Sequence, residues 1–169
     1  MYYYYYLGIL ITPILFLRYF FRKPERKSID DKIVSPCDGI VTKVDSSDIS
    51  IFLSLLDVHW QYTPINSKIK SIETIYGANN MAILPKSSHN SGVKVVFDTE
   101  YGDLSVTQRV GFFVRRIQNN IKIGDIVKQS NPYGIIRFGS RVDIVLPKNT
   151  ECILKRGQRI VGGETILIK

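Results

Sequence analysis

The chain has 169 residues and a formal net charge of +8, which is enough for one domain with a hydrophobic core and too short for two comfortable ones. Its 12 glycines and 7 prolines, with short bursts of valine and isoleucine, favour strands and turns over a helix bundle. The positive charge favours an anionic partner, either nucleic acid or an anionic membrane surface. The two cysteines, Cys37 and Cys152, suit neither a metal site nor a disulfide scaffold, so we expect a reducing setting and no metal.

The N-terminal segment carries no charge over residues 1–17, and after Arg18 the apolar run continues to Phe21. As a helix this segment extends about 25 to 32 Å, just enough for the hydrocarbon core of a bilayer. The tyrosines suit a membrane interface, and the basic flank that follows is expected on the cytoplasmic side. This flank comprises Arg18, Arg22, Lys23, Arg26 and Lys27.

Two interpretations of this helix stay open. It either spans the membrane, which we favour, or lies in the interface or on the domain. A secretory signal does not fit, because the basic residues follow the apolar run. We therefore predict a membrane anchor with its basic flank over residues 1–27 and a β domain over residues 28–169. Nucleic-acid binding is disfavoured, since much of the excess charge lies beside the anchor and no recognition motif is present.

Two β-rich runs follow the linker, separated by a Pro-x-Asp-Gly turn signal that places Asp38 at a bend. An aspartate before glycine ordinarily supports the turn with its own carboxylate. The next apolar run, Ile49–Leu56, predicts a buried strand that leads to His59. A lone histidine is more often structural than catalytic, but this one follows a core strand close to a carboxylate. In an extended chain Asp57 and His59 share a face, so Asp57 competes with Asp38 as the residue that orients the imidazole.

Alternating apolar residues on both sides of a turn at 101–103 predict a hairpin over residues 93–106. Beyond it, Arg115 and Arg116 could bind a phosphate, although paired arginines on a β protein are usually a charged face. A faint repeat relates Ile121–Val127 to Leu154–Val161. Two such copies suit a compact barrel or sandwich of two similar halves, the shape also used by lipoyl-type carrier domains.

Between two β-prone runs lies the pair Gly139-Ser140. Read alone, it is a tight bend between strands. Glycine, however, lacks the Cβ that would obstruct attack at its own carbonyl and tolerates strained backbone angles. The Ser140 hydroxyl could therefore reach the preceding peptide bond.

Five segments, in this order, resemble the short type of phosphatidylserine decarboxylase proenzymes. They are Phe-Phe-Arg-Lys-Pro-Glu-Arg (20–26), Ser-Pro-Cys-Asp-Gly (35–39), Asp-Val-His (57–59), Arg-Arg-Ile (115–117) and Ile-Arg-Phe-Gly-Ser-Arg-Val-Asp (136–143). The resemblance covers nearly the whole chain. Two features differ from longer members: Tyr62 stands where they have a second histidine, which we interpret as the short subtype, and their Asn-Glu-Arg-like stretch is not recognisable at residues 87–90.

The resemblance implies a mainly β fold, a barrel or sandwich with lipoyl-like hybrid motifs after the N-terminal helix, and self-cleavage between Gly139 and Ser140. It implies that Ser140 attacks the Gly139 carbonyl, with His59 as base and Asp38 orienting it. The products would be a β chain of residues 1–139 and an α chain of residues 140–169. Ser140 would become a pyruvoyl group, the electron sink for decarboxylation through a Schiff base.

The substrate that the resemblance implies is phosphatidylserine, converted to phosphatidylethanolamine by a membrane-associated domain on the cytoplasmic side. Candidate substrate contacts are Arg115, Arg116 and Arg141. The expected partners are the phospholipid, the membrane, the two cleaved chains and a second copy in a homodimer. Two alternatives stay open: a non-catalytic, membrane-anchored β-barrel that binds lipid or protein, and a decarboxylase of an archaeal-type serine phospholipid, because the chemistry touches only the headgroup.

Overall fold

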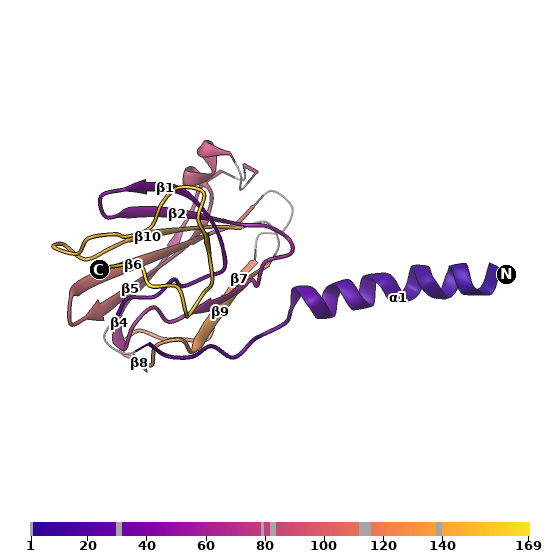
Figure 1. The fold of residues 1–169 in the computed structure, drawn as a ribbon, viewed down its shortest axis with the longest axis horizontal. Coiled ribbons are helices and arrows are strands. Elements are labelled where there is room, and N and C mark those ends of the chain that lie inside the picture. The colour runs from indigo at the N-terminus through magenta and orange to yellow at the C-terminus, as the bar shows by residue number, and fades with distance from the viewer. Residues whose placement is uncertain (1, 30–31, 79, 82–83, 112–115, 138–139) are drawn as a thin grey trace.

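The computed structural model describes residues 2–29, 32–78, 80–81, 84–111, 116–137 and 140–169. It consists of one N-terminal helix, α1 (Tyr2–Phe20), followed by a β body in two sheets (Figure 1). The predicted mainly β fold with a preceding helix is confirmed. The barrel alternative is wrong: the larger sheet runs from one end strand to another and does not close on itself.

The larger sheet has eight strands in the order β11-β1-β2-β10-β6-β5-β4-β8, and the smaller has three in the order β3-β9-β7. All strand pairs within them are antiparallel. In chain order the elements of the β body are β1 (Gly39–Asp45), β2 (Asp48–Leu53), β3 (Trp60–Tyr62), β4 (Ser67–Ile75), the 3₁₀ helix η1 (Pro85–His89), β5 (Gly92–Thr99), β6 (Gly102–Arg109), β7 (Arg116–Asn119), β8 (Ile126–Val127), β9 (Pro132–Arg137), β10 (Ser140–Val145) and β11 (Arg159–Ile160).

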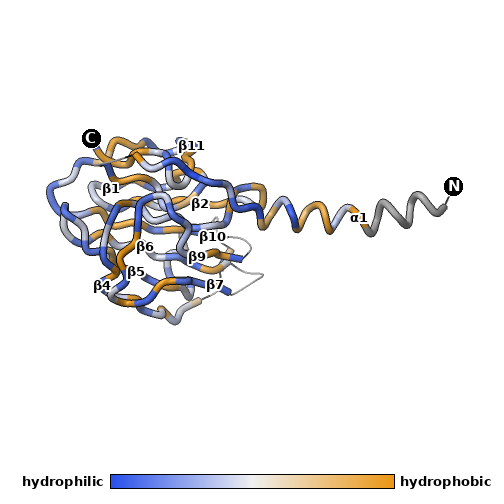
Figure 2. Tube along the Cα trace, turned by 90° about the horizontal axis from the view of Figure 1, so that it is seen from below, coloured by the Kyte–Doolittle hydropathy of each residue, from blue (hydrophilic) through white to orange (hydrophobic). Residues whose placement is uncertain are grey.

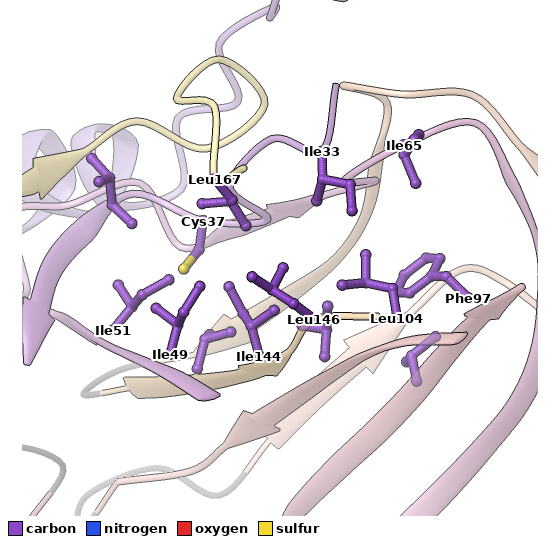
Figure 3. Close-up of a cluster of buried hydrophobic side chains, with 14 of the residues drawn as sticks. Ile33, Cys37, Ile49, Ile51, Ile65, Phe97, Leu104, Ile144, Leu146 and Leu167 are labelled. Carbon is purple, nitrogen blue, oxygen red and sulfur yellow. The ribbon is translucent and has the colours of Figure 1, made fainter. Parts of the chain in front are cut away.

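A single core lies between the sheets (Figure 3). The larger sheet contributes apolar residues at every second position of β2, β5, β6 and β10, as the side-chain period of two requires. The smaller sheet contributes Ile136 and Tyr133, whose ring meets that of Phe97 edge to face with centroids 5.6 Å apart. The predicted hairpin is confirmed as β5 and β6, paired from Gly92 with Arg109 to Thr99 with Gly102.

The predicted repeat is a structural repeat at the two ends of the larger sheet. In the first copy, Gly124 donates to the Ile69 carbonyl, and in the second Gly157 donates to the Val41 carbonyl, at 2.9 and 2.7 Å. Both glycines have positive φ, 92° and 85°, in tight turns. Each turn leads into a two-residue strand, β8 beside β4 and β11 beside β1. The same turn therefore covers both edges of the sheet, which leaves shorter unpaired edges.

Helix α1 projects from the β body, and the apolar residues of its described part lie outside the core (Figures 1 and 2). Residues 11–19 are all exposed, whereas Phe20 is fully buried. Among the residues that the structure describes, no helix is both long and apolar enough to cross a membrane. The predicted helix itself is confirmed.

The predicted strand over Ile49–Leu56 ends earlier than expected. Strand β2 stops at Leu53, and Leu55 and Leu56 are exposed in the turn that follows. The cause is Asp57, whose carboxylate accepts hydrogen bonds from the Ser54 N–H and hydroxyl at 2.8 and 2.7 Å. These bonds close a tight turn that the apolar run alone does not indicate.

Replacing Ile144 by alanine should lower the free energy of unfolding by about 2–5 kcal/mol, because this β10 side chain is 1% exposed in the core. The matched control is Val145→Ala on the same strand. Val145 is 44% exposed, so its loss should change stability by less than about 1 kcal/mol. Urea unfolding followed through the fluorescence of the single tryptophan measures both. Equal losses would contradict the assigned faces of β10.

Candidate active site

Ser140 is the first residue of β10 and belongs to its inward face, together with Val142 and Ile144. It pairs with Leu53 of β2, and the following residues pair with both β2 and β6. The side chain is completely buried, and its Oγ has no hydrogen-bond partner among the described residues. A buried hydroxyl normally has a partner, so Ser140 is an exception that needs an explanation.

His59 lies just beyond the turn that Asp57 closes, and its carbonyl accepts a hydrogen bond from the Ile136 N–H of β9 at 3.1 Å. Its imidazole Nδ1 is 3.0 Å from the main-chain carbonyl oxygen of Asp57. Because a carbonyl oxygen only accepts, Nδ1 carries the hydrogen and the neutral ring keeps its lone pair on Nε2. This Nε2 is buried without a partner in the described part of the chain. The imidazole is thus held in the tautomer that a general base requires.

The surroundings of His59 keep it neutral. Burial lowers the pKa of its imidazole, and the carbonyl and charge of Asp57 offset this only in part. Part of that burial comes from α1, since the ring of Phe20 lies over the imidazole with centroids 4.3 Å apart. The helix end is tied to the same region, because Trp60 donates its indole N–H to the Phe21 carbonyl. Near neutral pH the ring is therefore an unprotonated base.

The backbone brings Ser140 and His59 to the same end of the sandwich. Ser140 lies opposite Leu53, and the turn from Ser54 leads directly to His59. From the other side, Ile136 is bonded to His59 and precedes Ser140 by four residues. Two strand connections thus lead both predicted residues to this end, and each has a buried polar atom without a partner among the described residues.

Neither candidate aspartate contacts the imidazole with its carboxylate. Asp38 accepts from Arg26 at 3.0 Å and from the Gly162 N–H at 2.8 Å. Burial raises the pKa of Asp38, and these two donors offset part of that increase. The second candidate, Asp57, accepts from Ser54 and from Arg159 at 2.7 Å. Burial alone would raise the pKa of Asp57, but these bonds outweigh it and lower the pKa.

The partner of Nδ1 is therefore a backbone atom, which sequence reasoning missed. No residue type signals such a contact, because every residue has a carbonyl. Sequence reasoning also missed three amide side chains, those of Gln61, Gln108 and Asn119, each of which has a buried atom without a partner in the described part of the chain. Glutamine and asparagine carry no pattern that distinguishes them from ordinary surface residues.

The two candidate arginines that the structure describes, Arg116 and Arg141, do not converge on Ser140. Arg141 is the next residue of β10, so its side chain leaves the other face of the sheet. There it donates to Asp143 at 2.7 Å and to Ser50 at 2.8 Å, and Arg109 donates to the same carboxylate at 2.7 Å. Arg116 is exposed at the start of β7. Arg115 and Gly139 lie outside the described residues.

The structure offers no alternative centre of chemistry in the described ranges. No group of three or more histidine, cysteine, aspartate or glutamate residues there could hold a metal ion. A surface groove of about 820 Å³ lies between Arg26, Lys68 and Lys128, and neither Ser140 nor His59 lines it. The buried pair is therefore the candidate active site.

The chain is similar to known proteins. The family model described as phosphatidylserine decarboxylase matches residues 14–168. A protein of Methanosarcina barkeri with the name of an archaetidylserine decarboxylase proenzyme is 36% identical over 161 residues, covering 94% of this chain and 79% of that protein. A phosphatidylserine decarboxylase proenzyme of Streptomyces avermitilis is 38% identical over 152 residues, covering 87% of this chain and 71% of that protein. The chain belongs to the phosphatidylserine decarboxylase family and is a decarboxylase.

Proposed function

We propose that this chain cuts itself between Gly139 and Ser140 and, once cut, decarboxylates a serine phospholipid to the corresponding ethanolamine phospholipid. The observation that carries the proposal is a pair of buried atoms at one end of the sandwich, Ser140 Oγ and His59 Nε2, which have no partner among the residues that the structure describes. A nucleophile and a base without other partners are available to each other and to a reacting peptide bond. Both relatives are named as proenzymes, which agrees with a chain that must be processed.

In the cleavage, Ser140 Oγ bonds to the Gly139 carbonyl carbon while His59 Nε2 takes the hydroxyl proton. The C–N bond then breaks, the proton goes to the released amine of Ser140, and an ester joins the two parts. Loss of the Ser140 Cα proton eliminates the Gly139 carboxylate and leaves a dehydroalanine. Its hydrolysis releases ammonia and leaves the pyruvoyl end. No outside oxidant or reductant is needed, because each step only moves protons and exchanges bonds.

The site fits a pyruvoyl group, because the group replaces a side chain that is already buried at the start of a strand. It would supply an electrophilic carbonyl for Schiff-base decarboxylation, a chemistry that no ordinary side chain supplies. Around it, the β10 pairing holds the position, the sheets exclude water, and His59 can move a proton. In this role the Asp57 carbonyl keeps the His59 tautomer, and the charge of Asp57 acts on the imidazole.

The substrate is a phospholipid whose headgroup is serine. Relatives are named for both phosphatidylserine and archaetidylserine, so the lipid tail is of either the ester or the archaeal type. We further propose that α1 lies in the membrane interface. Its exposed apolar residues favour that position, and Arg18, Arg22 and Lys23 would then face anionic headgroups on the cytoplasmic side. The β domain of residues 28–169 would be catalytic, and the parts 1–139 and 140–169 would stay associated.

Ser140→Ala should leave the chain uncut and inactive, because the nucleophile and the source of the pyruvoyl group are both removed. The control is Ser105→Ala, which removes another buried serine of the larger sheet. Mass spectrometry under denaturing conditions shows whether each variant has been cut. Wild type and the control should give parts of 1–139 and 140–169. Normal cutting of the Ser140→Ala chain would refute the assignment.

His59→Gln should slow the cutting by about 100-fold or more, as expected for loss of a general base. The chain offers a matched control in His89, its only other histidine, which is exposed in η1. His89→Gln should be cut at the wild-type rate. Pulse labelling followed by gel electrophoresis gives both half-times. A wild-type half-time for His59→Gln would remove His59 from the mechanism.

The cutting rate should stay constant as the pH falls from about 8 to about 6.5 and decrease only below that. The reason is that burial lowers the pKa of His59, so the free base persists below the ordinary value. Freshly synthesised chains shifted to a series of pH values give the profile. A rate that already halves above pH 6.5 would mean that the base has an ordinary or raised pKa.

A further inference from the structure

A cluster of amide side chains lies between the two sheets, next to the proposed site. In the smaller sheet, Gly134 pairs with Gln61 on one side and with Asn119 on the other. Directly paired residues point to the same face, so the two amides flank a position that has no side chain. A Cβ at Gly134 would collide with Asn119 Oδ1, so glycine is what lets this amide lie across β9.

The third amide comes from the larger sheet and faces the other two. Gln108 of β6 is completely buried, and its Oε1 accepts a hydrogen bond from Asn119 Nδ2 at 2.8 Å. This bond crosses from one sheet to the other, so the three amides share the space between the sheets. Gln61 in turn donates to the His59 carbonyl at 3.3 Å.

The register places this cluster beside Ser140. Gln108 pairs directly with Val142 of β10, and Ser140 shares the inward face of β10 with Val142. Ser140 is therefore a diagonal neighbour of Gln108, at a Cα separation of about 7–8 Å. On the other side, Gln61 is two residues from His59. The cluster thus adjoins both members of the proposed site.

Each amide has one buried atom without a partner among the described residues: Gln61 Oε1, Asn119 Oδ1 and Gln108 Nε2. Buried polar groups are costly unless they are hydrogen-bonded, so three in one place indicate a ligand or ordered water. As a set they offer two acceptors and one donor, all of them uncharged.

On the basis of the proposed function, we propose that Gln61, Gln108 and Asn119 form the subsite that binds the amino-acid end of the serine headgroup. The two acceptors suit the ammonium group, and the Gln108 donor suits the carboxylate. A neutral donor also suits the reaction. A fixed cation would stabilise the carboxylate most strongly before its charge disperses, whereas an amide orients it with less ground-state stabilisation. The product has no carboxylate, so Gln108 loses its partner and release is favoured.

The test is Gln108→Met, which keeps the length of the side chain and removes the amide. The control is Gln118→Met, which makes the same change at an exposed position on β7. Mass spectrometry should show that both variants cut themselves as completely as wild type does. With rates normalised to cut chain and substrate presented in vesicles of serine phospholipid, Gln108→Met should lower kcat/KM by about 10- to 100-fold, mainly through KM. Gln118→Met should match wild type.

The outcomes separate this subsite from the proposed function. If wild type is not cut, the proposed function fails. If wild type is cut and active but Gln108→Met keeps its KM, the amides hold only water and the subsite is refuted. Slower cutting with an unchanged KM would also refute it, since the cluster would then serve the cleavage. If Gln108→Met does not fold, Asn119→Ser, which keeps a polar group, replaces it under the same criteria.

Discussion

The pairing of β10 with both of its neighbours is the constraint on which the site depends. From Ser140 onwards this strand is bonded to β2 on one side, and from Arg141 to β6 on the other. A strand with two partners cannot turn its side chains over without breaking both ladders. The inward position of Ser140 is thus fixed by residues well beyond it, including Val142 and Ile144 in the core. The proposed nucleophile is therefore held by the sheet, since its hydroxyl has no hydrogen-bond partner among the described residues.

The same ladders explain why a cut at the start of β10 is compatible with the fold. The part from Ser140 onwards also contributes β11 beside β1, and an isolated bridge joins Ile166 to Val34. These antiparallel contacts connect residues 140–169 to the first third of the chain. A break in the covalent chain would therefore leave the hydrogen-bonded sheet intact.

Much of the fold can be predicted because it is recorded in local patterns. Alternation along β5 and β6 predicts the hairpin, and the repeated Gly-containing turns predict two similar edges. Gly139-Ser140 and His59 stand out by type and position. The features that could not be predicted depend on side-chain partners that no local pattern indicates. Arg26 reads as part of a lipid-facing basic flank, yet it is paired with Asp38 and Glu164 at 3.0 and 3.6 Å. The apolar side chains of Leu55 and Leu56 predict a strand. The carboxylate of Asp57, three residues after Ser54, instead closes a turn and ends the strand before them.

The contact between Phe20 and His59 joins two properties that are usually separate. Phe20 is the last residue of a helix whose neighbouring positions are exposed, and its ring helps to keep the imidazole dry. Water admitted at this point would return the proton affinity of His59 toward that of a free imidazole. The packing of α1 against the β body and the proton affinity of His59 are therefore not independent. A substitution that shifts the end of α1 would also change the acid–base chemistry of the imidazole.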